Sequence, residues 1–240
     1  MSAWNLGLDV LALADAENRG MLVSAGFDAQ HVQQGHQVGA DSVRAVLKAC
    51  RTAGVKYLTL YAFSTENWIR PKTEVMGLMS LLSKFLRDQS FELHDNKTRL
   101  RVIGHKEDLP APVRKELDKV IAETSHYTEG TLTLALSYGG RVEITDAVRA
   151  IAEEVKRGDL NPADITEKII SQHLYTSEIP DPDFMIRTSG EQRISNFLLW
   201  QLSYSEFYFT ETLWPDFREK EFLEAIEVYK NRHRRFGDIK

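Results

Sequence analysis

Two stretches of the sequence gather the residue types that bind anions. Residues 64–71 (STENWIRP) hold hydroxyl groups, a side-chain amide and an arginine. Residues 187–196 (RTSGEQRISN) hold two arginines and three hydroxyl groups. An arginine guanidinium is a planar fork of N–H donors that matches the oxygens of a phosphate group. Both stretches therefore predict sites for phosphate or diphosphate groups.

Each stretch also has a plainer interpretation. Residues 64–71 fit a capped turn with polar surface groups, and on position alone this interpretation carries about equal weight. A solvated polar loop is the alternative for residues 187–196. That alternative is weaker, because the loop runs directly into the apolar residues 197–200 (FLLW) and because Gly190 lets the backbone approach a ligand closely.

Glu206 is a third candidate, since it stands among aromatic residues in the stretch 204–209 (YSEFYF). A carboxylate in such a setting is paired with a cation, caps another group or holds a metal. Near two phosphate-binding loops Mg²⁺ is the natural candidate, because it prefers a few carboxylates plus phosphate oxygens. Without those loops a structural ion pair is the better interpretation. His36 receives no role from its spacing alone.

The composition indicates which binding partners and which cellular compartment to expect. The chain has 240 residues, 42% hydrophobic and 27% charged, with a formal net charge of -5. A weakly acidic chain binds nucleic acid poorly, so we expect no nucleic-acid partner. The single cysteine, Cys50, excludes an internal disulfide. No apolar run approaches the ~18 residues of a membrane span, and the first residues lack the basic start of a secretory signal, so we expect a cytoplasmic protein.

Short apolar runs alternate with longer amphipathic ones along the chain. We predict strands at residues 6–13, 56–63, 98–103, 131–136, 184–187 and 206–210. Helices are predicted at residues 38–50, after a possible cap at Asp41, and at 71–93, 113–121, 142–155 and 219–234. This alternation predicts a single α/β domain over residues 1–240, with a mostly parallel central sheet covered by helices on both faces. Ligands of such sheets bind at the carboxyl ends of the strands, where both polar stretches begin.

Together these pieces resemble the cis-prenyltransferases, the undecaprenyl diphosphate synthase family. The matching stretches are GH at 35–36, YLTLYAFSTENWIRP at 57–71, RLRVIG at 99–104, SYGGR at 137–141, IRTSGEQRISNFLLWQLSYSEFYFTETLWPDF at 186–217 and RHRRFG at 232–237. The resemblance implies an apolar tunnel for a growing chain, lined on one side by the long helix that starts at Pro71. By its spacing alone, the apolar stripe of that helix is ordinary core.

The resemblance also implies an activity. Such enzymes add isopentenyl diphosphate to an allylic diphosphate, often farnesyl diphosphate, and make Z double bonds. Mg²⁺ helps to bear the charge of the departing diphosphate. They usually form homodimers, and residues 208–236 are aromatic and rich in arginine, which suits an interface. A long isoprenoid product makes peripheral membrane association plausible.

Individual roles follow from the same resemblance. Arg187, Arg193 and Ser195 match the site for the isopentenyl diphosphate group, and Glu206 matches a Mg²⁺ ligand. Asn67 and Ser64 match residues of proton removal and substrate alignment, with His36 close by. The other substrate-binding candidates are Thr65, Glu66, Trp68, Arg70 and Ile194.

The sequence departs from the family at residues 1–34. The family's first strand ends in Asp-Gly-Asn-Gly-Arg-Trp, a loop that cradles the allylic diphosphate, and this motif is absent. Alignment by the strand at 6–13 places the motif's catalytic Asp at Asp15, whereas counting back from His36 places it at Arg19. Three interpretations stay open: Asp15 works in a rebuilt loop, the allylic site has been lost, or residues 1–34 are not the native segment.

Three functions are therefore compared. The first is an active isoprenyl transferase. The second is a catalytically impaired relative that binds diphosphate or a partner subunit. The third, another phosphate-handling enzyme such as a phosphatase, is weak because no phosphatase motif or Walker-type glycine loop is present. The first two require residues 64–70 and 187–193 to meet at one edge of the sheet.

Overall fold

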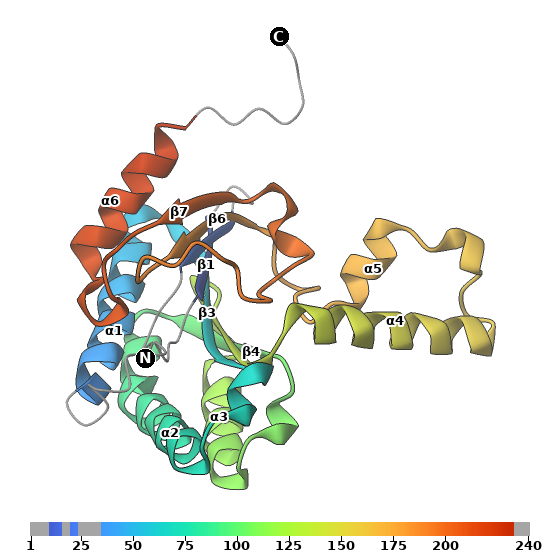
Figure 1. The fold of residues 1–240 in the computed structure, drawn as a ribbon, viewed down its shortest axis with the longest axis horizontal. Helices are drawn as coiled ribbons and strands as arrows, with labels where there is room; N and C mark the ends of the chain where they lie inside the picture. The colour runs from blue at the N-terminus through green and yellow to red at the C-terminus, as the bar shows by residue number, and fades with distance from the viewer. Residues whose placement is uncertain (1–9, 16–19, 24–34, 233–240) are drawn as a thin grey trace, which may run out of the picture.

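The chain builds one central sheet with helices packed around it (Figure 1). The structure, a computed structural model, describes residues 10–15, 20–23 and 35–232, and it describes only the backbone of residues 10–15, 20–23 and 35–40. The sheet has the strand order β4-β5-β3-β1-β2-β6-β7. Its strands are β1 (Val10–Asp15), β2 (Gly20–Val23), β3 (Val55–Ser64), β4 (Thr98–Ile103), β5 (Gly130–Tyr138), β6 (Pro182–Arg187) and β7 (Glu206–Phe209).

Most neighbouring strands run parallel, as predicted. β3 pairs in parallel with β5, β5 with β4, and β6 with β7, while β2 pairs in parallel with both β3 and β6. β1 is the exception, because it pairs antiparallel with β2, β3 and β6. Only residues 16–19 separate β1 from β2, and a connection that short joins antiparallel strands, whereas parallel neighbours need a long crossover.

Five of the six described helices have nearly the predicted limits, and α5 was not predicted. The six are α1 (Gly35–Ala53), α2 (Lys72–Asp95), α3 (Ala111–Thr124), α4 (Gly140–Arg157), α5 (Glu167–His173) and α6 (Glu219–Lys230). α1 begins before the expected cap, so Asp41 lies inside the helix, where it pairs with Arg44 at 3.1 Å. The predicted last helix ends at Lys230, and residues 233–234 lie outside the described part of the chain.

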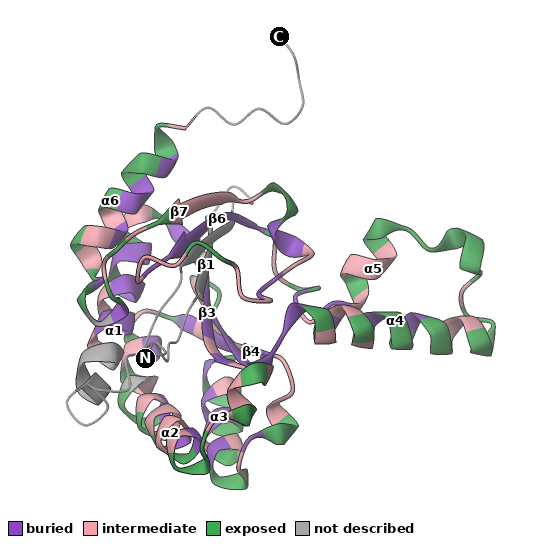
Figure 2. Cartoon of the chain, viewed as in Figure 1, coloured by how far each residue is buried: buried purple, intermediate pink, exposed green. Residues whose placement is uncertain are grey.

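Two hydrophobic clusters pack on the two faces of the sheet. The strands β3 and β6 are largely buried (purple in Figure 2). The larger cluster joins alternate strand residues such as Leu60 and Leu134 to buried residues of α1, α2, α3 and α6. The smaller one joins Tyr61 and Tyr138 to Phe197, Leu198 and Leu202. The second face is therefore covered largely by the segment that follows the polar stretch at 187–196, and this packing fixes where that stretch lies.

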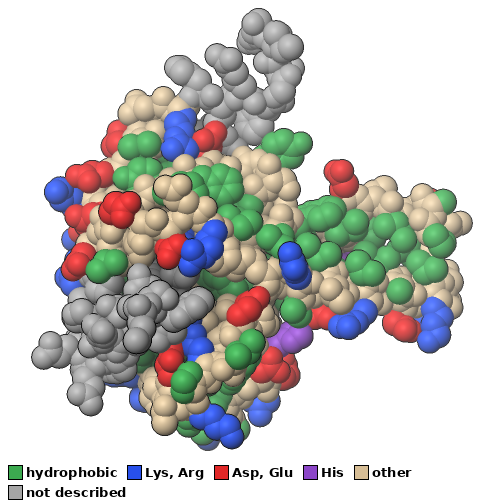
Figure 3. Space-filling view, in the orientation of Figure 1, with side chains coloured by type: hydrophobic (Ala, Val, Ile, Leu, Met, Phe, Trp, Pro, Cys, Tyr) green, Lys and Arg blue, Asp and Glu red, His purple; other side chains and the backbone are tan. Residues whose placement is uncertain are grey.

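Helices α4 and α5 form an arm that extends away from the sheet (Figure 1). The two helices pack on each other, and His173 Nε2 lies 2.9 Å from Glu154 Oε1. Hydrophobic side chains gather on the visible face of this arm (Figure 3), and Val148 of α4 is 54% exposed. Among the described helices none is both long and apolar enough to cross a membrane.

Candidate functional site

The two polar stretches meet at the carboxyl edge of the sheet, as predicted. Ser64 is the last residue of β3 and Arg187 the last of β6, and both strands run parallel to β2 between them. Asn196 Nδ2 donates a hydrogen bond to Glu66 Oε1 at 2.9 Å. This contact joins residues 130 positions apart, so the loop after β6 is tied directly to the turn after β3.

The turn after β3 is a 3₁₀ helix, Thr65–Ile69, closed by a capping box. The backbone N–H of Ser64 donates to Asn67 Oδ1 at 2.8 Å. Asn67 therefore has the role that the capped-turn interpretation gives it, because its side-chain oxygen stabilises the start of the turn. Any contact of Asn67 with a substrate would use its amide nitrogen or require the turn to rearrange.

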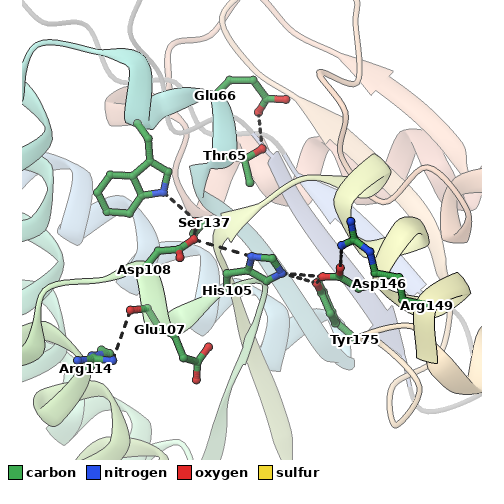
Figure 4. Close-up of polar contacts among 11 residues, drawn as sticks. Thr65, Glu66, His105, Glu107, Asp108, Arg114, Ser137, Asp146, Arg149 and Tyr175 are labelled. Atoms are coloured by element: carbon green, nitrogen blue, oxygen red, sulfur yellow. Dashed lines mark hydrogen bonds and ion pairs between the residues drawn. The ribbon is translucent and has the colours of Figure 1, made fainter. Parts of the chain in front are cut away.

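Glu66 holds Asn196 in place and keeps its negative charge. Burial raises the pKa of this carboxyl, but hydrogen bonds from Asn196, from its own backbone and from Ser64 and Thr65 outweigh burial and leave the pKa below its usual value. Thr65 Oγ1 donates to Glu66 Oε2 at 3.1 Å (Figure 4). An ionised carboxylate repels a diphosphate, so Glu66 suits the support of the loop better than contact with the anion.

Asn196 also caps helix α4. Its backbone oxygen accepts from the N–H of Gly140 at 2.6 Å, and its Oδ1 accepts from the N–H of Arg141 at 2.9 Å. A Cβ on Gly139 would lie 2.7 Å from Asn196 Nδ2 and 2.8 Å from Thr65 Oγ1, so only glycine fits there. The sequence carries no local signal for this cap, because the capping residue comes 55 positions after Arg141 in the first turn of the helix.

The loop after β6 has an unusual backbone. Ser189, Gly190, Ser195, Asn196 and Leu198 have φ values of 68°, 70°, 48°, 62° and 41°. Left-handed conformations are uncommon for residues other than glycine, and they cluster at ligand sites where the surroundings enforce them. Here the backbone N–H groups of Ser189 and Gly190 donate to Thr212 and Thr210 at 3.0 and 2.9 Å. The loop is therefore held in a preset shape.

The two arginines of this loop have different environments. Arg187 is completely buried at the end of β6. The Arg193 side chain is 64% exposed and forms an ion pair with Glu191. Ile194 packs against the smaller hydrophobic cluster. Arg193 is thus the guanidinium that an anion from solvent can reach, whereas Arg187 is enclosed by the protein.

Trp68 and Arg70 are both fixed by polar contacts. Trp68 Nε1 donates to Ser137 Oγ at 2.8 Å, and its ring packs edge-on against Phe63 with centroids 4.8 Å apart. Arg70 Nη1 lies 3.0 Å from Glu74 Oε1, one turn along the chain at the start of α2. Both side chains of the ion pair are about one-fifth exposed, at 19% and 21%.

Glu206 lies further from this edge and has a cation as its partner. It pairs in register with Phe184, whereas Arg187 pairs with Phe209, so Glu206 sits about 10 Å back along the strands. Its Oε2 accepts from Arg232 Nη1 at 2.8 Å. Among the described residues no group of three His, Cys, Asp or Glu could hold a metal ion. The described contact with Arg232 fits the ion-pair interpretation of Glu206, and its role as a Mg²⁺ ligand stays a prediction.

Asp15 does not join the other predicted residues. It ends β1, which runs antiparallel to β3, and its backbone pairs with Val55 at the amino end of β3. Ser64 lies at the other end of that strand. The backbone of Asp15 thus lies at the edge of the sheet opposite Ser64, because β1 runs antiparallel to β3, and a role of Asp15 in the site stays a prediction. His36 lies in the first turn of α1, where only the backbone is described.

Comparison with known proteins shows which family the chain resembles. A family model described as undecaprenyl diphosphate synthase matches residues 25–237. An isoprenyl transferase of Heliobacterium mobile is 52% identical over 206 residues, which are 86% of this chain and 79% of that protein. Another from Geobacter sulfurreducens is 49% identical over 203 residues, covering 85% and 82% of the two chains.

Two solved structures share the fold. Lavandulyl diphosphate synthase from Lavandula x intermedia, in complex with dimethylallyl diphosphate, superposes with a TM-score of 0.83 at 40% identity, covering 86% of this chain and 89% of that chain. A probable undecaprenyl diphosphate synthase from Campylobacter jejuni gives a TM-score of 0.75 at 36% identity, covering 84% and 93%. With more than half of its length matched by the family model and half of its aligned residues shared with curated relatives, the chain belongs to the undecaprenyl diphosphate synthase family of isoprenyl transferases.

Proposed function

We propose that this protein condenses isopentenyl diphosphate with an allylic diphosphate, such as farnesyl diphosphate, and releases a Z-polyprenyl diphosphate. The observation that carries the proposal is the Asn196–Glu66 hydrogen bond, which holds the two phosphate-type loops at one edge of the sheet. Two diphosphate substrates must lie side by side for their carbon atoms to react. Because the two loops are joined to each other before either substrate binds, they fix the distance between the two bound substrates.

In this reaction the allylic carbon loses its diphosphate, a new carbon–carbon bond forms to the terminal carbon of isopentenyl diphosphate, and a proton leaves that substrate. We assign Arg193, Arg187 and Ser195 to the isopentenyl diphosphate group. Arg193 is exposed and would exchange Glu191 for phosphate oxygens, while the buried Arg187 would add positive charge at the start of the same loop. Ser64, Asn67 and Trp68 would face the reacting carbons from the turn after β3.

Magnesium belongs to the proposal as an ion that arrives with the diphosphates. Mg²⁺ takes phosphate oxygens, water and one or two carboxylates as ligands, so it does not need a cage built by the protein. When bound, it would offset the negative charge of the leaving diphosphate. Glu206 is the carboxylate that the resemblance offers for it, and Arg232 holds one of its oxygens.

We further propose a cytoplasmic homodimer, with peripheral membrane contact made only through the lipid product. Among the described strands β7 is the last in the sheet order, so none of them pairs with its outer side. Phe207 and Phe209 stack on one another there, with Phe209 40% exposed and Tyr204 80% exposed. Exposed aromatic residues at a strand edge are typical of a protein interface.

The test is direct incubation with radiolabelled isopentenyl diphosphate, farnesyl diphosphate and Mg²⁺, followed by extraction of polyprenyl products. We expect labelled product from the unmutated protein and a strong loss of product from Arg193→Gln. Arg157→Gln is the matched control, because Arg157 is an exposed arginine on the distal arm, paired with Asp159 at 2.7 Å. If the unmutated protein makes no product at high concentration, the catalytically impaired relative becomes the better description.

A further inference from the structure

Ser137 lies near the carboxyl end of β5 in a constrained environment. It is 1% exposed and has a φ of 47°, in the region that residues other than glycine seldom occupy. No role was assigned to it from the sequence. A buried serine kept in a strained conformation points to a requirement imposed by its surroundings.

Three hydrogen bonds hold Ser137 in this conformation. Its backbone oxygen accepts from the N–H of His105 at 3.2 Å. Its hydroxyl accepts from Trp68 Nε1 at 2.8 Å and donates to Asp108 Oδ2 at 2.6 Å. Figure 4 shows the resulting chain from the indole through Ser137 to Asp108. The hydroxyl has one proton, so donation to Asp108 leaves its lone pair facing the indole N–H.

The turn after β4 packs closely against the end of β5, where Ser137 lies. Gly104 has a φ of 99°, and a Cβ there would lie 3.0 Å from the Ser137 backbone oxygen. The turn carries Asp108 in the residues that follow, and Asp108 is 47% exposed in its side chain. The carboxylate therefore reaches Ser137 from the surface, so Asp108 can be substituted without opening the core.

These contacts fix the orientation of the Trp68 indole ring. An indole has a single N–H donor, and Ser137 takes it, while Phe63 contacts the ring from the side. Trp68 is only partly buried. It belongs to the same 3₁₀ helix as Glu66, which binds the loop of Arg193 through Asn196. A partly exposed aromatic face beside anion-binding loops suits a ligand that carries an apolar chain on a diphosphate.

We propose that Ser137 and Asp108 are positioning residues that hold the Trp68 indole as one wall of the subsite for the apolar chain of the allylic substrate. This inference rests on the proposed function. Asp108 orients the Ser137 hydroxyl, the hydroxyl fixes the indole N–H, and the fixed ring face contacts the first isoprene units. Loss of either residue frees the ring to rotate and weakens binding of the prenyl chain more than binding of the diphosphate.

The test combines a spectroscopic signal with ligand binding. The indole ¹H–¹⁵N resonance of Trp68, identified by its loss in Trp68→Phe, reports the hydrogen bond to Ser137. An unreactive farnesyl thiodiphosphate reports the whole allylic site, and inorganic pyrophosphate reports the anion site alone. The variants are Ser137→Ala and Asp108→Ala, with Asp108→Asn as the conservative variant because it keeps an acceptor oxygen. Asp118→Ala is the control, since Asp118 pairs with Lys106 on the same surface.

We expect Ser137→Ala and Asp108→Ala to move the Trp68 resonance and to weaken binding of the thiodiphosphate roughly five- to tenfold, as the loss of one or two hydrogen bonds predicts. Pyrophosphate binding should change less than about twofold in both, and Asp108→Asn and Asp118→Ala should stay close to the unmutated protein. The inference is overturned if the Trp68 resonance moves while thiodiphosphate affinity does not, or if Asp108→Ala leaves the resonance in place.

The two hypotheses fail in different ways. The resonance and the binding of an unreactive analogue do not depend on turnover, so they test the positioning role even in a protein without activity. Absence of labelled product from the unmutated protein contradicts the proposed function alone. An unmutated protein that binds pyrophosphate but shows no tighter binding of the farnesyl analogue has no prenyl subsite, and that result contradicts the inference.

Discussion

Asn196 donates a hydrogen bond to Glu66 across 2.9 Å and thereby joins the loop after β6 to the turn after β3. The same asparagine accepts the N–H of Arg141 and that of Gly140, so a single residue fixes three segments of the chain. We regard this clamp, made of Asn196, Glu66 and the start of α4, as the element that brings to one place the two loops to which we assign the diphosphate substrates.

Substitution of Asn196 should separate its two side-chain functions. Asn196→Asp keeps an oxygen for the N–H of Arg141 but loses the donor to Glu66 and sets two carboxylates against each other. We expect the KM for both diphosphates to rise roughly tenfold, equivalent to about 1.4 kcal/mol. Steady-state kinetics with each substrate varied in turn will measure it.

Asn196→Gly is the control for backbone strain, because glycine adopts the φ of 62° without cost. We expect Asn196→Gly to be more stable than Asn196→Ala by about 1 kcal/mol, with a similar KM in both. A KM that rises for one diphosphate but not for the other in Asn196→Asp would show that the clamp does not couple the two loops.

Gly139 is the position where the clamp leaves no room. A Cβ would lie 2.7 Å from Asn196 Nδ2, so Gly139→Ala must push the amide away from Glu66. We expect a loss of stability of about 1–3 kcal/mol, measured by urea unfolding, together with weaker substrate binding. Gly77→Ala is the matched control in helix α2, because nothing lies within 4 Å of its Cβ.

In contrast to Gly139→Ala, Gly77→Ala should stabilise the protein by about 0.5–1 kcal/mol, because alanine loses less conformational entropy in a helix. Equal effects of the two substitutions would contradict the crowding that the structure shows at Gly139. If Gly139→Ala is destabilised but keeps normal KM values, the crowding at Gly139 does not affect how the clamp positions the two loops.

Much of the fold could be predicted from the pattern of apolar residues. The strand predicted at residues 98–103 coincides with β4, and the long helices between strands correctly imply parallel neighbours. The same rule places Ser64 and Arg187 at one edge, which is why the two polar stretches could be combined into one site. These features are encoded by residues close together in the chain.

The features that the sequence did not reveal depend on distant residues or on very short segments. Helix α5 has only seven residues, too few for a clear helical period. The direction of β1 follows from the length of its connection to β2, and β2 was not predicted, so the sequence did not indicate that β1 ends at the edge opposite Ser64. Asn196 and Ser137 act on residues far away in sequence, and no local motif marks such contacts.

The Glu206–Arg232 pair should behave as a modest structural ion pair. The two side chains are 34% and 31% exposed and 2.8 Å apart, so solvent screens much of the attraction. A double-mutant cycle with Glu206→Gln and Arg232→Gln, followed by urea unfolding without metal, should give a coupling energy of about 0.2–1 kcal/mol. No coupling would contradict the pair, and coupling that vanishes on adding Mg²⁺ would show competition for the carboxylate.

The β7 edge predicts a dimer that aromatic contacts hold together. Phe209 is 40% exposed and stacks on Phe207 at 6.2 Å between centroids. We expect light scattering at micromolar concentration to give the mass of a dimer for the unmutated protein and a shift toward monomer for Phe209→Glu. Ile69→Glu is the control, because Ile69 is 88% exposed but lies in the turn after β3. A monomer of the unmutated protein would contradict the dimer.

The arm should lose stability as the pH rises, because of His173. Its Nδ1 lies 2.7 Å from the backbone oxygen of Ile169 and its Nε2 lies 2.9 Å from Glu154, and these two contacts raise the pKa of the imidazole above its usual value. A raised pKa in the folded state means that the stabilisation is complete below the unfolded pKa of about 6.5 and disappears as the pH passes the folded pKa.

Hydrogen exchange of α5 should therefore be slower at about pH 6 than at about pH 8.5, after correction for the intrinsic rate, and His173→Gln should remove the difference. His126→Gln, at an exposed histidine, should keep it; a corrected protection that is equal at both pH values in the unmutated protein would contradict the role of His173.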